Sequence, residues 1–102
     1  MTIITMHKVN ENHLARVTSE MKTLGTPTVR AIWDGEVYYA VEGTHRLMAA
    51  YNLGLEPIIE HVEYSDETII IELDGSEEEF VVSELADMLM ATNGSNSHIL
   101  RF

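Results

Sequence analysis

The spacing of hydrophobic residues predicts an amphipathic helix near the start of the chain. Across residues 13–24, apolar side chains recur every three or four positions, which places them on one helical face. These side chains are Leu14, Val17, Met21 and Leu24. Gly25 is a natural end for this helix, and Pro27 prevents its continuation.

Short runs of β-branched and aromatic residues predict six strands, at 2–6, 28–33, 37–41, 57–62, 68–73 and 79–82. Asp-Gly pairs at 34–35 and 74–75 are typical of tight hairpin turns. Two further helices are expected, at about 45–53, where Gly54 follows, and at 83–90, with Ser83 as the N-cap.

This mixture of helices and hairpins predicts the α+β class. A chain of 102 residues is expected to form one domain, with a small mixed sheet and two core helices in residues 1–63. Residues 64–92 are expected to add a hairpin and a helix to that domain. Residues 93–102 read as a loop and tail, and the pattern leaves open whether the last five residues dock on the body.

The charge balance narrows the function. The chain has six basic and seventeen acidic residues, which gives a formal net charge of −11. Nucleic-acid binding draws on many Lys and Arg contacts to phosphates, so this composition disfavours it and favours at most a focused anion pocket. There is no cysteine, so a disulfide framework and a thiol nucleophile are excluded. No apolar run reaches the length of a membrane span, and we expect a cytoplasmic protein without membrane association.

Scarce positive charge is concentrated at the expected start of the second helix, in the run Gly43, Thr44, His45 and Arg46. A helix N-terminus presents backbone N–H groups, and a preceding glycine lets an anion approach closely. The hydroxyl, the imidazole and the guanidinium add further donors. The run therefore indicates a phosphate or carboxylate site; an ordinary capped helix with exposed His and Arg is the alternative.

The Gly-Thr-His-Arg run follows a hairpin and precedes an alanine-rich helix, and in this context it resembles the ParB/sulfiredoxin superfamily. The resemblance covers roughly residues 1–63 and is nearest to the sulfiredoxin branch, which has a Gly-x-His-Arg signature. It implies a nucleotide phosphate site that includes Gly43, Thr44, His45 and Arg46. The same branch holds phosphates with a basic residue, a Ser and a Thr on the preceding helix, and the matching positions here are Arg16, Ser19 and Thr23.

Departures from the family pattern limit what the resemblance implies. Sulfiredoxins carry their essential cysteine where Thr44 stands, so reduction of a sulfinic acid is excluded. ParB proteins carry a glutamate there. The expected ligand is ATP or CTP, with Mg²⁺ arriving on the phosphates. If the protein is an enzyme, phosphoryl transfer or nucleotide hydrolysis fits best, with His45 steadying developing charge.

Two alternatives to catalysis stay open. The chain could be a non-catalytic module that captures a nucleotide, or a small phage- or plasmid-type regulator that binds a protein through its acidic surface. The run Ser76, Glu77, Glu78 and Glu79 is either such a docking surface or a solvated hairpin loop.

The remaining candidates have plain structural readings beside their functional ones. His7, His13, His61 and His98 lack the spacing of metal ligands. Glu20, Asp34 and Glu42 are acidic helpers or surface charges, and Lys22 is a phosphate contact or an exposed lysine. Trp33, Tyr38 and Tyr39 are core residues or a stacking platform for a base.

Overall fold

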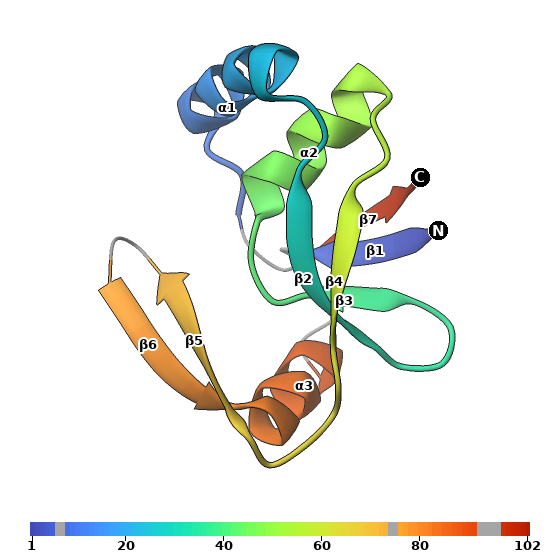
Figure 1. Cartoon of the computed structure of the whole chain (residues 1–102), viewed down its shortest axis with the longest axis vertical. Coiled ribbons are helices and arrows are strands. Elements are labelled where there is room, and N and C mark those ends of the chain that lie inside the picture. The colour runs from blue at the N-terminus through green and yellow to red at the C-terminus, as the bar shows by residue number, and fades with distance from the viewer. Residues whose placement is uncertain (6–7, 74–75, 92–96) are drawn as a thin grey trace.

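Three helices and seven strands form in the part of the chain that the computed structural model describes, which is residues 1–5, 8–73, 76–91 and 97–102 (Figure 1). The helices are α1 (Glu11–Leu24), α2 (Thr44–Leu53) and α3 (Val82–Ala91). Five strands make one mixed sheet and two make a separate hairpin. The α+β class expected from the sequence is confirmed.

The five-stranded sheet has the order β4-β2-β3-β1-β7. Its strands are β1 (Thr2–Thr5), β2 (Thr28–Trp33), β3 (Tyr38–Ala40), β4 (Ile58–Val62) and β7 (His98–Arg101). β1 runs parallel to β3, and β2 runs parallel to β4. The β2–β3 and β1–β7 pairs are antiparallel. The tail that the sequence left undecided therefore contributes an edge strand beside β1.

Successive residues of the strands point to opposite faces of this sheet, and each face is covered by different elements. Ile3, Val29 and Ala40 pack with Leu47 of α2. α1 in turn packs on α2, where Met21 lies with the buried pair Ala49 and Ala50. The two helices thus form stacked layers over one face (Figure 1).

The other face packs against the C-terminal unit, which consists of α3 and the hairpin of β5 (Thr68–Leu73) and β6 (Ser76–Val81). Ile4, Ile32 and Tyr39 of the sheet share a core cluster with Leu85 and Ala86 of α3. The hairpin extends away from the sheet, with its far end remote from α3 (Figure 1). Consecutive residues Glu77, Glu78 and Glu79 are all exposed, as expected for a strand with little cover.

One predicted helix start is wrong. Ser83 was expected to be the N-cap of the third helix, but α3 already begins at Val82, directly after β6. The backbone N–H groups of Val82 and Ser83 donate to the carbonyls of Glu67 and Ser65, and the Ser83 hydroxyl donates to Asp66. The segment before β5 therefore does the capping, through contacts that local sequence does not reveal.

Two predicted loops, the turn at 74–75 and most of 93–97, lie outside the described residues. Within the described ranges, no helix has the length and apolar character needed to cross a membrane.

Candidate functional site

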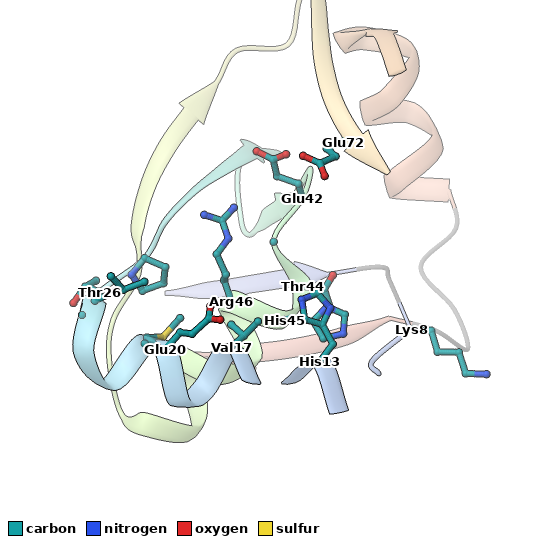
Figure 2. Close-up of a pocket in the computed structure, with 15 residues that line it drawn as sticks. Lys8, His13, Val17, Glu20, Thr26, Glu42, Thr44, His45, Arg46 and Glu72 are labelled. Carbon is teal, nitrogen blue, oxygen red and sulfur yellow. The ribbon is translucent and has the colours of Figure 1, made fainter. Parts of the chain in front are cut away.

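A cleft of about 910 Å³ lies where the start of α2 meets the face of α1. The described residues that line it come from the segment before α1, from α1, the α1–β2 loop, the β3–α2 loop, the first turn of α2 and the β5–β6 hairpin (Figure 2). All four residues of the Gly-Thr-His-Arg run are among them. The run predicted from sequence as an anion site therefore lies in a concave surface.

Gly43 sets the geometry of the helix start. It is the residue before α2, with φ 84° and ψ 28°, a left-handed conformation that glycine adopts readily. A Cβ at this position would lie 3.1 Å from Cγ1 of Val29 and 3.3 Å from Nη2 of Arg46. No described side chain caps the helix, and the first intrahelical bond runs from Leu47 N–H to the Gly43 carbonyl at 2.9 Å. The preceding amides thus have no carbonyl of their own helix as acceptor.

Arg46 brings a permanent positive charge to this helix start. Its Nη1 donates to the Thr28 carbonyl of β2 at 3.1 Å, and its guanidinium lies next to the Gly43 backbone. Because a guanidinium carries five N–H donors, this single bond leaves donors for an anion. The side chain is exposed, and Figure 2 shows it reaching along the cleft from α2. The bond to β2 thus positions the Arg46 side chain, and other N–H groups of its guanidinium can still donate to a ligand.

The Thr44 hydroxyl, which the sequence predicted as a donor to an anion, is buried. The residue is only 4% exposed, and its Oγ1 shares a hydrogen bond with Oγ1 of the equally buried Thr5 on β1. The hydroxyl therefore fastens the first turn of α2 to the sheet. What Thr44 offers the cleft is its backbone N–H.

His45 joins the starts of the two helices. Its Nε2 accepts the backbone N–H of Asn10 at 3.0 Å, so in this arrangement the ring proton belongs on Nδ1. Its ring lies on that of His13, with centroids 4.2 Å apart and a tilt of 31°. Figure 2 shows both rings beside Thr44 at the same end of the cleft.

The α1 side of the cleft combines polar and apolar side chains. His13 and Glu20 lie there with an apolar group of Val17, Met21 and Leu24, together with Pro27. Leu24 is 81% exposed, an unusually open position for a leucine side chain. The cleft thus sets a helix start rich in donors against a partly hydrophobic surface.

Arg16, Ser19 and Thr23 lie on α1 but are not among the described residues that line this cleft. All three are exposed. At 100° per residue they occupy the outer side of the helix, whereas its cleft side carries His13, Val17, Glu20 and Leu24. Arg16 instead approaches Glu20 one turn on, at 4.0 Å between Nε and Oε1. The structure brings together the α2 part of the predicted phosphate site and leaves the α1 part outside it.

Carboxylates are also present in the cleft. Glu20, Glu42 and Glu72 line it, beside the cations Lys8 and Arg46. In Figure 2 the carboxylates of Glu42 and Glu72 point toward one another, away from the end occupied by the two histidines. The charge of the described lining is therefore mixed, with Arg46 at the α2 start and Lys8 in the segment before α1 as its cations.

Arg30 of β2 pairs with the Glu42 carboxylate. Its Nε and Nη2 both lie 2.8 Å from Glu42 Oε1, and Nη2 also donates to the Ile70 carbonyl of β5 at 2.9 Å. Both side chains of this ion pair are about one-quarter exposed. One guanidinium thus connects the sheet, the residue before Gly43 and the hairpin.

The other sequence candidates lie elsewhere. Asp34 is in the β2–β3 turn, where its Oδ1 accepts the N–H groups of Glu36 and Val37, both at 2.8 Å. Those hydrogen bonds, led by the one from Val37, lower the pKa of the Asp34 carboxyl. Tyr39 is buried in the core, and this burial raises the pKa of its phenol. The rings of Trp33 and Tyr38 are in contact at a tilt of 52°, with centroids 4.8 Å apart, and neither residue is in the cleft lining.

Within the described ranges, no three His, Cys, Asp or Glu side chains gather into a group that could hold a metal ion. Lys22 is exposed and is not part of the cleft lining, and His7 lies outside the described residues.

Sequence reasoning missed Lys8, Leu24 and Glu72 as parts of the cleft, and it did not place His13 beside His45. His13, Val17, Glu20 and Leu24 do follow helical spacing, so the α1 wall carried a readable signal. Glu72 carried none, because only the position of the hairpin in the fold brings it near the α2 start.

Comparisons of this chain with protein-family models, with curated proteins and with solved structures gave no match. The resemblance to the ParB/sulfiredoxin superfamily therefore stays a prediction based on its residues.

Proposed function

We propose that this protein binds a phosphate-bearing ligand of the nucleotide class at the start of α2. The observation that carries the proposal is the left-handed Gly43 before a helix start that no described side chain caps, with the Arg46 guanidinium beside it. Backbone N–H groups and a guanidinium aimed at one place are what an anion requires. The amides of Thr44 and Arg46 and the Arg46 side chain would contact the phosphate.

The size and lining of the cleft favour a nucleotide over inorganic phosphate. A volume of about 910 Å³ is within the range of sites for whole small molecules, and a lone phosphate would fill a small part of it. The apolar surface of Val17, Leu24 and Pro27 suits a base or another flat apolar group. Mg²⁺ carried by a triphosphate would find a carboxylate ligand in Glu72.

Turnover is a second candidate, as phosphoryl transfer or nucleotide hydrolysis, with His45 steadying charge on a phosphoryl oxygen. Oε1 of Glu42 is bound by Arg30, and we assign Glu42 as the partner of that guanidinium and assign no general base. Capture of a nucleotide without reaction is therefore the simpler proposal.

The test is a thermal-shift screen with ATP, CTP, GTP and pyrophosphate, each with and without Mg²⁺. A ligand present at one hundred times its Kd stabilises the native state by about 2.7 kcal/mol, which raises Tm by roughly 10 °C or more for a domain of this size. We expect at least one nucleotide to produce such a shift. If none of the four compounds raises Tm at millimolar concentration, the proposal is wrong.

Release of phosphate or of a nucleoside diphosphate, measured on the compound that binds, separates capture from turnover. Tight binding with no product over hours supports a capturing module. Sustained release with Mg²⁺ establishes the enzymatic alternative.

A further inference from the structure

Among the described residues, the ion pair with the shortest distance is at the edge of the cleft, between Arg30 and Glu42. Glu42 directly precedes Gly43, and both residues line the cleft. An unpaired carboxylate at this point would offset the positive electrostatic potential of the α2 N-terminus and of Arg46. It would also repel an incoming phosphate, because both groups are negatively charged. The Glu42 carboxylate would therefore weaken phosphate binding at the α2 start if its charge were not neutralised.

Arg30 neutralises the charge of the Glu42 carboxylate through direct contacts. Two of its nitrogens lie 2.8 Å from the same Glu42 oxygen, a distance typical of charge-assisted hydrogen bonds. The third contact, from Nη2 to the Ile70 carbonyl at 2.9 Å, holds the guanidinium against β5. With side chains only about one-quarter exposed, the pair is screened by solvent less than a surface ion pair.

We propose that Arg30 is a positioning residue of the α2 anion site, which neutralises Glu42 and holds its carboxylate away from the bound phosphate. Arg30 itself is not among the described lining residues and acts through Glu42. Since the same guanidinium binds the Ile70 carbonyl, the seating of the β5–β6 hairpin also determines the charge that a ligand meets at the α2 start. This inference rests on the proposed function, because it concerns the affinity of that site.

The test is a double-mutant cycle on ATP affinity, measured by calorimetry without Mg²⁺ at low ionic strength. Arg30→Met leaves the Glu42 charge unpaired, and we expect roughly threefold to tenfold weaker binding. Glu42→Gln removes the repelling charge and leaves Arg30 cationic, so binding should become roughly twofold to fivefold tighter. Arg30→Met combined with Glu42→Gln should return the affinity to within about twofold of the native protein.

The sign of the Glu42→Gln effect separates electrostatic positioning from a structural role. If the ion pair mattered only for folding, Glu42→Gln would weaken binding or leave it unchanged, and either result overturns the proposal even if Arg30→Met fails to fold. Added salt should shrink the difference between the native protein and Arg30→Met, and a difference that persists unchanged at 1 M salt would also overturn it.

A native protein that binds neither ATP nor any other compound of the thermal-shift screen contradicts the proposed function together with this inference. A native protein that binds ATP but shows no coupling between positions 30 and 42 contradicts the inference alone.

Discussion

The starts of α1 and α2 lie against one another, yet the chain treats them in opposite ways. At α1, the Asn10 side chain accepts the N–H of His13 at 2.9 Å, and Glu11 supplies a negative charge in the first turn. At α2, the preceding residue is a left-handed glycine, no described side chain caps the helix, and the first turn contains no acid. One helix start is capped by its own side chain, whereas at the other no described side chain serves as the cap.

A capping side chain would not fit the backbone at the α2 start. A Ser, Thr, Asn or Asp in place of Gly43 would supply a capping side chain, but at φ 84° it would be strained and would crowd Val29. Arg46 lies over this glycine, which lets the guanidinium and the backbone face the same point.

The largest expected effect comes from breaking the α2 start. Gly43→Ala introduces a left-handed alanine and a Cβ that meets Val29 Cγ1 at 3.1 Å, so we expect a loss of about 2–3 kcal/mol in the free energy of unfolding. Gly54→Ala is the matched control, because Gly54 has φ 72° but open space around the added Cβ, and it should cost about 1–2 kcal/mol. Urea denaturation measures both, and equal losses would show that the contacts at Gly43 contribute nothing.

A smaller effect is expected from breaking the α1 start. Asn10→Ala removes the cap of α1 and should lower the free energy of unfolding by about 1 kcal/mol. The backbone N–H of Asn10 still reaches His45, so ATP affinity should change by less than about twofold if the two starts have separate roles. Calorimetry checks this, and a loss of binding as large as that of a cleft residue would contradict the separation.

The smallest effect is expected at Asp34. Its carboxylate accepts backbone N–H groups of the β2–β3 turn, as a bound anion would accept those of the α2 start. The N–H groups of Val37 and Glu36 lower its pKa, so the stabilisation is present above the ordinary aspartate value of about 3.9 and is lost as pH falls through the lowered native pKa. Because the carboxylate is exposed, we expect Asp34→Ala to cost only about 0.5 kcal/mol at pH 7.

Thermal unfolding at several pH values checks this prediction for Asp34. The native protein and Asp34→Ala should converge in stability on the acid side, since both then lack the charged acceptor. A difference that is constant across the acid range would mean that charge is not the cause.

Sequence predicted the elements well wherever the signal was local. The strand at Thr28–Trp33 and the helix end at Leu24 match the structure, because β-branched runs and a Gly-Thr-Pro break act within a few residues. β7 was left undecided, since His98–Arg101 is a strand only through its pairing with β1 at the other end of the chain. The start of α3 was misplaced for the same kind of reason, because distant carbonyls cap it.

The candidate site also has a part that local sequence predicts and a part that depends on tertiary packing. The run from Gly43 to Arg46 could be read from residue types alone, and it does line a cleft. Which side of α1 faces that cleft depends on how the helix rolls on α2, where Met21 packs with Ala49 and Ala50. That packing places His13 and Leu24 in the cleft lining and leaves Arg16, Ser19 and Thr23 outside it, so the α1 contribution could not be settled by spacing.

Arg46 and Arg16 give the most direct test of the central claim, that the anion site is the α2 start. Arg46→Ala and Arg16→Ala remove the same charge from exposed positions, so any general effect of net charge is common to both. We predict that Arg46→Ala weakens ATP binding by about tenfold or more, the scale of a charged hydrogen bond, while Arg16→Ala changes it by less than about twofold. Equal effects of the two substitutions, or an unchanged affinity in a folded Arg46→Ala variant, would contradict the account.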